Sequence, residues 1–167
     1  IGVILATPEN AAKALSSGGV VLVFPGGDYD SYRSTFEQNV IDFNGRKGYV
    51  RTAIQADVPI VPAVSIGGQE TQLFLGRGTR IAKRLGLPKI RTDILPLSFG
   101  FPFGLSVLVP VNMPLPAKIV TEVLEPIDVL ATFGENYDIA AVDSHVRRVM
   151  QAALHRLARK RRLPLLG

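Results

Sequence analysis

The chain has 167 residues, of which 47% are hydrophobic and 20% are charged, a composition that excludes an intrinsically disordered protein and suits one globular domain. It contains no cysteine, which excludes disulfide bonds, a cysteine nucleophile and a cysteine-ligated metal. The net charge of +5 arises in residues 71–167, where Lys and Arg outnumber Asp and Glu by two to one. We expect residues 1–167 to form a single domain.

The first part of the chain alternates between strand and helix patterns. Two short apolar runs, Gly2–Ala6 and Val20–Phe24, are typical of buried strands. Residues 7–18 start with threonine and proline and end in glycine, which are the start and stop signals of a helix. A second helix over Gly48–Asp57 and a strand within residues 58–66 complete a βαβαβ order. We therefore predict an α/β fold with a mostly parallel central sheet and flanking helices.

The middle of the chain is less regular. Leu73–Leu87 alternates apolar and basic residues, which predicts a short basic amphipathic helix of the kind that lies on anionic membranes. Ile94–Pro116 runs for 23 residues without a charge, long enough for a membrane span. Its five prolines and two glycines exclude a continuous helix. We expect extended or looped apolar chain that is buried, the commoner case, or that rests at a membrane interface.

The C-terminal part contains one more strand pattern and the clearest helix. Ala117–Asp128 alternates as a strand does, and from Asp138 apolar residues recur every three or four positions. The opposite face of this helix is basic. His145 and His155 both lie on it without a third ligand nearby, so we predict no metal site.

Two basic clusters, Arg77–Arg91 and Arg147–Arg162, account for the positive charge. Such clusters contact nucleic acid, anionic lipid or phosphorylated substrates, or simply form a solvated surface. Few aromatic residues accompany them, and the chain has no helix-turn-helix or RNP-like motif. We therefore predict no nucleic-acid partner.

Polar residues gather directly after the second predicted strand, in the sequence FPGGDYDSYR. In parallel α/β sheets, ligands bind at the carboxyl ends of strands, although an ordinary glycine-rich turn has the same position. The chain has no Gly-x-Ser-x-Gly nucleophile elbow and no P-loop or dinucleotide-binding fingerprint.

Three blocks, GGVVLVFPGGDYDSYR, GRKGYVRTAIQADVPIVPAVSIGG and MPLPAKIVTEVLEPID, resemble in this order the glycerolipid and lysophospholipid acyltransferases. The third family motif, commonly Phe-Pro-Glu-Gly-Thr-Arg-Ser, corresponds to Phe24–Asp30. The fourth, around Val-Pro-Ile-Val-Pro-Val, corresponds to Val58–Val64, and a Lys-Gly pair that opens a helix corresponds to Lys47–Gly48. The Gly-Gly version is most similar to the monoacylglycerol and diacylglycerol acyltransferase-like subgroup. The resemblance covers about residues 1–130.

The resemblance implies transfer of a fatty acyl chain from acyl-CoA or acyl carrier protein to a hydroxyl of a glycerolipid or lysophospholipid, without a further cofactor. In the family a His-x-x-x-x-Asp motif supplies the general base and the carboxylate that orients it. Here Met150 and Lys160 stand five residues after His145 and His155, so neither histidine begins that motif.

The chain opens within an apolar run. We expect it to be the C-terminal portion of an acyltransferase domain, an incomplete glycerolipid acyltransferase-like fold that lacks the catalytic pair and is inactive alone. Its partner would then be the missing N-terminal segment of the same protein. The alternative is a non-catalytic module that has the same fold and binds lipid or another partner.

The third-motif segment supplies four candidate substrate-binding residues and no catalytic residue. Gly26 and Gly27 permit close approach of a ligand, and their N–H groups are candidates to face a phosphate or a developing oxyanion. In the family the glutamate and glycine of this motif help to bind the acceptor. Because Gly26 stands in the place of that glutamate, we expect Asp28 or Asp30 to serve instead.

Three basic residues complete the candidate site. Arg33 follows the third-motif segment, and Arg46 and Lys47 precede a predicted helix, so all three are candidates for phosphate contacts. Simple surface charge is the alternative for Arg46 and Lys47. The apolar tract and the basic stretch before it fit a peripheral enzyme at the cytoplasmic face of a membrane, which takes its lipid from the bilayer.

Overall fold

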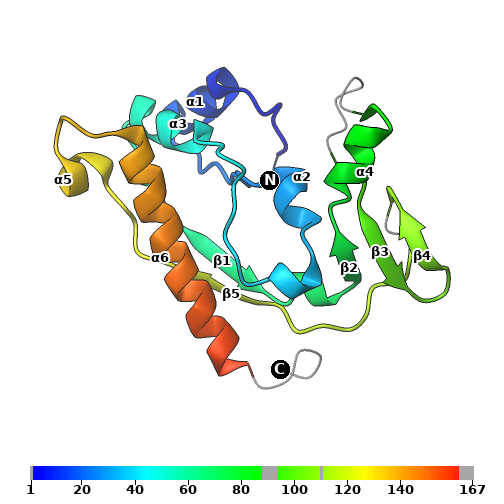
Figure 1. The fold of residues 1–167 in the computed structure, drawn as a ribbon. Helices are drawn as coiled ribbons and strands as arrows, with labels where there is room; N and C mark the ends of the chain where they lie inside the picture. The colour runs from blue at the N-terminus through cyan, green and yellow to red at the C-terminus, as the bar shows by residue number, and fades with distance from the viewer. Residues whose placement is uncertain (1, 88–93, 110, 162–167) are drawn as a thin grey trace.

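The computed structural model describes residues 2–87, 94–109 and 111–161. Figure 1 shows the helices, short 3-10 helices (η) and strands in this part of the chain. In order they are α1 (Pro8–Ser16), α2 (Gly27–Ser31), η1 (Thr35–Glu37), α3 (Gly48–Gln55), β1 (Ala63–Ile66), η2 (Gly68–Glu70), β2 (Leu73–Gly76), α4 (Thr79–Arg84), β3 (Leu97–Gly100), β4 (Gly104–Val107), β5 (Val120–Val123), α5 (Val129–Phe133) and α6 (Ile139–Lys160).

Two small antiparallel sheets stand where the sequence predicted one mostly parallel sheet. β1 pairs with β5, with Ala63 opposite Val123 and Ile66 opposite Val120. β2, β3 and β4 form the second sheet in that order, and both of its pairings are antiparallel. The prediction of a mixed α/β class is confirmed, whereas the parallel central sheet is wrong.

The predicted strands Gly2–Ala6 and Val20–Phe24 are irregular chain. Their apolar side chains are largely exposed, with Val3 at 102% and Val20 at 98%. An apolar, β-branched composition favours extended backbone, but a strand also needs a neighbour that satisfies its N–H and C=O groups. No strand in the described part of the chain pairs with these segments, so they remain unpaired.

Helices α1, α3 and α6 begin close to where the sequence predicted them. The Thr7 hydroxyl accepts a hydrogen bond from the Asn10 N–H (3.3 Å) at the start of α1. The Asp138 carboxylate accepts one from the Ala140 N–H (3.0 Å) at the start of α6. α3 covers most of the predicted range Gly48–Asp57. Caps act within one turn of the chain, so these predictions are confirmed without reference to tertiary contacts.

Helix α6 organises the core, because both buried clusters pack on it. One cluster joins α6 to α3 and α5 and consists of Val50, Ile127, Val129, Val142 and Val146. The other joins α6 to β1 and consists of Val64, Ile66, Ala153, Leu154 and Leu157. In Figure 1, α6 crosses the β1–β5 sheet, and the β2–β3–β4 sheet lies on the opposite side of the molecule from α5.

The middle of the chain forms more strand than the sequence indicated. The predicted helix Leu73–Leu87 divides into β2 and the short α4. Gly78 separates them with a positive φ of 58°, and a side chain there would collide with the Leu95 carbonyl. The described residues of the Ile94–Pro116 tract, 94–109 and 111–116, are extended or looped chain, as predicted, and contain β3 and β4. The expected burial is wrong for its second half, which is largely exposed, whereas residues 94–96 are buried.

Candidate functional site

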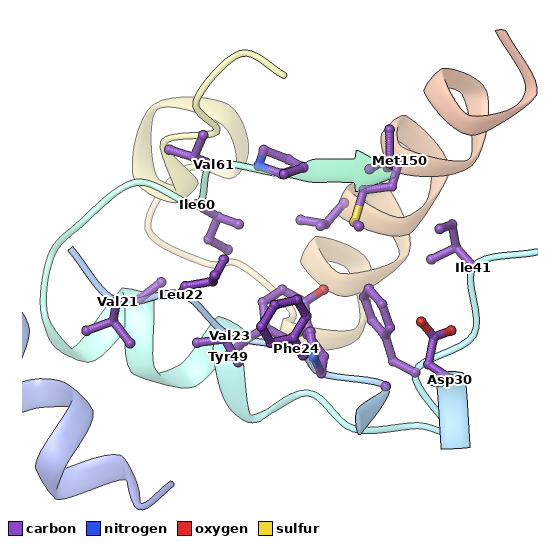
Figure 2. Close-up of a pocket in the computed structure, with 18 of the residues that line it drawn as sticks. Val21, Leu22, Val23, Phe24, Asp30, Ile41, Tyr49, Ile60, Val61 and Met150 are labelled. Atoms are coloured by element: carbon purple, nitrogen blue, oxygen red, sulfur yellow. The ribbon is translucent and has the colours of Figure 1, made fainter. Parts of the chain in front are cut away.

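An apolar groove of about 580 Å³ lies between residues 21–27, residues 58–65 and helix α6. Figure 2 shows Leu22 and Phe24 on one side, Ile60 and Val61 across from them, and Met150 of α6 to their right. These two stretches contain the blocks that resemble the third and fourth motifs. The fold therefore brings together two segments that are more than thirty residues apart in sequence.

The glycine pair builds a tight turn at one end of the groove. Gly26 is buried at the N-terminus of α2, and a side chain there would collide with the side chain of Asp30. Gly27 has a positive φ of 52°, and its N–H donates to the Phe24 carbonyl (3.0 Å). That N–H is therefore engaged in the turn. A residue with a side chain is excluded at position 26 in this geometry, because its Cβ would lie 2.3 Å from the Cβ of Asp30.

Arg46 holds this turn in place. Its Nη1 donates to the Gly26 carbonyl (2.8 Å) and its Nη2 contacts Asp28 Oδ1 (3.3 Å). A Cβ on Gly27 would lie 2.8 Å from Arg46 Nη1, so the glycine also makes room for the guanidinium. The structure thus gives Arg46 and Asp28 contacts with the turn itself. Both side chains are about half exposed and neither lines the groove.

Asp30 and Arg33 form an ion pair that lines the groove, with Arg33 buried and Asp30 partly exposed. Arg33 Nη2 lies 3.0 Å from Asp30 Oδ1, and the Arg33 side chain is 8% exposed. Its Nε and Nη1 have no hydrogen-bond partner among the described residues. Burial raises the pKa of the Asp30 carboxyl above its ordinary value, against the opposing charges of Arg33 and Arg77. Burial also lowers the pKa of the Arg33 guanidinium, which Asp30 only partly offsets.

Both pKa shifts have the same physical cause. The loss of water around the two charges exceeds their mutual attraction. Two buried guanidinium nitrogens of Arg33, Nε and Nη1, have no partner among the described residues. They remain available to an acceptor oxygen. Of the seven candidate residues, the structure places Gly26, Gly27, Asp30 and Arg33 in the wall of the groove. Lys47 lies outside it and occupies the position before α3 without a side-chain capping bond.

Two residues that the sequence analysis did not select support this site from outside. Gln69 Nε2 donates to the Ser31 carbonyl (2.9 Å). Arg77 Nε donates to the Tyr29 carbonyl (2.7 Å), and the Arg77 guanidinium lies 3.9 Å from the centre of the Tyr29 ring. Both come from segments around β2 that are far from the turn in sequence. No local pattern marks such contacts, and the basic cluster at Arg77 was the only signal.

A polar triad joins α3 to α6 beside the groove. The Tyr49 hydroxyl donates to Asp143 Oδ1 (2.9 Å), and Arg147 Nε donates to Asp143 Oδ2 (2.9 Å). Asp143 is 2% exposed, so these bonds satisfy a buried carboxylate. Burial and the bond to Asp143 raise the pKa of the Tyr49 hydroxyl.

Neither histidine belongs to the groove lining. The His145 ring packs edge-on against Phe133, with 5.4 Å between the ring centroids. His155 Nε2 lies 2.9 Å from Gln151 Nε2 on the surface of α6. Among the described residues, no three His, Cys, Asp or Glu side chains group in a way that could hold a metal ion.

Comparison with known proteins supplies independent information. Residues 5–66 match the model of the family described as Acyltransferase. These residues include the glycine turn, the Asp30–Arg33 pair, α3 and β1. The matched segment therefore contains most of the groove lining apart from α6.

Several curated proteins are similar to most of this chain. A Bos taurus protein named "DGAT1/2-independent enzyme synthesizing storage lipids" is 30% identical over 158 residues, which cover 93% of this chain and 45% of that protein. The Mus musculus protein of the same name is 32% identical over 139 residues, covering 83% of this chain and 40% of that protein. An uncharacterized protein of Mycobacterium tuberculosis is 32% identical over 164 residues, covering 95% of this chain and 43% of that protein.

The chain thus spans less than half the length of these curated relatives. No solved structure matches it significantly. The family match falls on the segments that build the groove, and the named relatives synthesise storage lipids. The chain is thus similar to the Acyltransferase family model over residues 5–66 and to these named relatives over most of its length.

Proposed function

We propose that this chain forms the acceptor-binding part of a lipid acyltransferase, which transfers a fatty acyl chain from acyl-CoA or acyl carrier protein to a lipid hydroxyl. The groove of about 580 Å³ carries this proposal. Its walls are mainly apolar and suit hydrocarbon, and the Asp30–Arg33 pair supplies a polar point that fixes the orientation of a ligand. The acyl donor acts as a substrate in this scheme, and no further cofactor takes part.

A neutral glyceride is the acceptor that we favour. The names of the bovine and mouse relatives refer to storage lipids, which suits the monoacylglycerol and diacylglycerol acyltransferase-like subgroup. A lysophospholipid acceptor, as in phospholipid biosynthesis, is the alternative. The free Nε and Nη1 of Arg33 would then contact its phosphate.

The catalytic base is proposed to come from outside these 167 residues. No histidine lines the groove, and neither histidine of the chain begins a His-x-x-x-x-Asp motif. Since the curated relatives extend well beyond the matched region, we assign the base to an N-terminal segment of the same protein. The chain alone would then bind lipid without acyl transfer, as a peripheral protein at the cytoplasmic face of a membrane, where acidic lipids are concentrated.

Lipid binding tests the groove directly. A fluorescent diacylglycerol analogue is titrated into the chain and into Leu22→Asp, which places a charge in the groove wall. We expect about 10-fold weaker binding by the variant, because a carboxylate beside hydrocarbon costs several kcal/mol or changes its pKa. Val3→Asp is the matched control, since Val3 is fully exposed and lies outside the groove. Equal affinities for the two variants would contradict the proposal.

Arg33→Met distinguishes the two acceptors. If the acceptor carries a phosphate, this variant should weaken binding of a lysophosphatidate analogue by about 10-fold or more. Binding of the diacylglycerol analogue should change little. Urea denaturation shows whether the variant retains the wild-type fold, and circular dichroism checks its helix content. Equal losses for both ligands would show that Arg33 only supports the groove.

Acyl transfer by the isolated chain is measured with radiolabelled acyl-CoA and diacylglycerol. We expect none, and turnover would contradict an external base.

The second candidate is a non-catalytic module that binds lipid or another partner through the same groove. The absence of a histidine from the lining favours it. The sequence of the complete protein separates the two functions. A His-x-x-x-x-Asp motif before the third-motif segment supports the enzyme, and its absence supports the module.

A further inference from the structure

The β3–β4 hairpin buries polar side chains. Ser98 and Ser106 lie opposite each other, are 2% and 8% exposed, and share a hydrogen bond of 2.9 Å. The buried Asn112 amide donates to Ser106 Oγ (3.2 Å) and to the Gly104 carbonyl (2.9 Å). Asn112 Oδ1 accepts from the Phe103 N–H (3.0 Å). The inner side of the hairpin is thus a connected polar network.

The outer side of the same hairpin is apolar. Phe99 and Leu105, the neighbouring cross-strand pair, are 51% and 60% exposed. The turn and the chain after β4 expose further apolar side chains. We call the exposed apolar side chains of the hairpin and its turn the hairpin surface; they are Phe99, Phe101, Phe103, Leu105 and Val107. Exposed apolar side chains concentrated on one element in this way indicate an interaction site.

Helix α4 stands at one end of this surface. The Leu95 N–H donates to the Arg77 carbonyl (2.8 Å), and the Leu108 N–H donates to the Pro96 carbonyl (2.9 Å). These bonds place the start of α4 beside the start of β3 and the end of β4, as Figure 1 shows. The charges of α4 therefore lie next to the hairpin.

The exposed side of α4 combines positive charge with apolar character. Arg80, Lys83 and Arg84 are exposed, and none of them forms an ion pair with a described residue. Ile81 and Leu85 on the same stretch are 44% and 63% exposed. The apolar surface thus ends in a cationic, partly apolar helix, which is the composition of interfacial membrane-binding elements.

We propose that the hairpin surface and the cations of α4 together dock on an anionic lipid bilayer. The apolar side chains enter the headgroup and acyl boundary, and the three cations contact acidic headgroups. A protein partner fits less well, because protein interfaces have about one hydrogen bond per 100–200 Å². The side chains of the hairpin surface contain no nitrogen or oxygen. This inference rests on the peripheral membrane association proposed above and names the surface that makes the contact; vesicle binding and lipid binding in the groove are measured separately, so either can fail alone.

Vesicle partitioning tests the apolar part. The chain is sedimented with phosphatidylcholine vesicles that contain phosphatidylserine. Phe101→Ser combined with Phe103→Ser should weaken partitioning by about 10-fold or more, because two exposed phenyl groups no longer leave water. Leu130→Ser is the matched control, since Leu130 is 50% exposed on α5 at the far end of the molecule (Figure 1). The control should bind as the wild type does.

The charges are tested on the same vesicles. Arg80→Gln with Arg84→Gln should weaken partitioning by about 5-fold for each charge removed. The loss should appear only with phosphatidylserine present and should diminish at high salt. Arg148→Gln, at an exposed position of α6, is the control and should have no effect.

A tryptophan reporter locates the contact. The chain contains no tryptophan, so Phe103→Trp introduces a single probe. Its emission should shift to shorter wavelength on vesicles and be quenched by brominated lipid, whereas Leu130→Trp should show neither change.

Two outcomes would overturn the proposal. One is equal partitioning by the wild type and the Phe101→Ser/Phe103→Ser variant. The other is a dimer in vesicle-free solution that this variant converts to monomer, which would make the hairpin surface an interface between two copies of the chain.

Discussion

The two sheets of this molecule alternate side chains in opposite senses. In β1, Val64 and Ile66 face α6 and are buried, whereas Ser65 lies on the exposed side. In the β3–β4 hairpin, Ser98 is buried and Phe99 is exposed. Both strands have the period of two that a sheet requires. The difference shows that alternation defines two faces, and that the element packed on a face decides which one is hidden.

Removing a side chain that packs α6 against β1 tests how strongly α6 covers the buried face of the β1–β5 sheet. Leu154→Ala deletes a side chain that is 2% exposed between α6 and β1. We expect it to lower the free energy of unfolding by about 3 kcal/mol, through lost burial and the cavity that remains. Urea denaturation measures this change. A loss below about 1 kcal/mol would mean that α6 is loosely packed on the sheet.

We expect the stability of the β3–β4 hairpin to depend on its buried polar network, as the stability of the α6 side depends on apolar packing. Asn112→Ala removes an amide that is 4% exposed and leaves the Phe103 N–H without its partner. The expected loss is about 2 kcal/mol, because buried polar groups become unsatisfied. Hydrogen exchange should show faster exchange in β3 and β4. Unchanged exchange there would show that the network does not support the hairpin.

The Tyr49–Asp143–Arg147 triad belongs to the α6 side of the molecule. It should make the free energy of unfolding depend on pH. The pKa of Tyr49 is raised above its ordinary value of 10.0, so the native state holds this proton more tightly than the unfolded chain. The resulting stability is complete below about pH 10 and is lost as the pH rises further. Tyr49→Phe should remove this alkaline loss and cost about 1 kcal/mol at neutral pH. An unchanged alkaline unfolding curve would contradict this assignment.

The smallest effect is expected on the outer side of the hairpin. Leu105→Ala makes the same chemical change as Leu154→Ala, but Leu105 is 60% exposed. Without a bilayer we expect a change within about 0.5 kcal/mol. A loss comparable to that of Leu154→Ala would show that the outer side is covered in solution, which would argue against an exposed hairpin surface.

The sequence predicted the parts of the structure that depend on neighbouring residues. Thr7 caps α1 as expected, the helix predicted from Asp138 begins at Ile139, and Gly48 opens α3. The glycine pair forms a turn, as its composition predicted, and this turn lies beside a groove, although no strand of a parallel sheet precedes it among the described residues. Whether substrate binds there stays a prediction. Strand pairing was predicted incorrectly, because Val20–Phe24 has strand composition but no paired neighbour among the described strands.

Roles that depend on distant contacts were set by tertiary structure. Arg46 was a candidate for phosphate contact by residue type, and the fold places its guanidinium on the Gly26 carbonyl. Arg33 was a candidate of the same kind, and the fold buries it beside Asp30 with two N–H groups free of partners among the described residues. Arg33 and Arg46 carry the same charge and could not be distinguished by sequence. Their burial differs because it depends on the segments that fold around each of them.

By itself, the sequence determined the starts of α1, α3 and α6, the apolar and uncharged character of residues 94–116, and the glycine turn at residues 26–27. Only the tertiary structure decided that β1 turns its apolar side toward α6 while the hairpin turns its serines inward. The physical reason is the range of the interactions. Caps and turns are satisfied within a few residues, whereas burial of a face requires a covering element that lies far away in sequence.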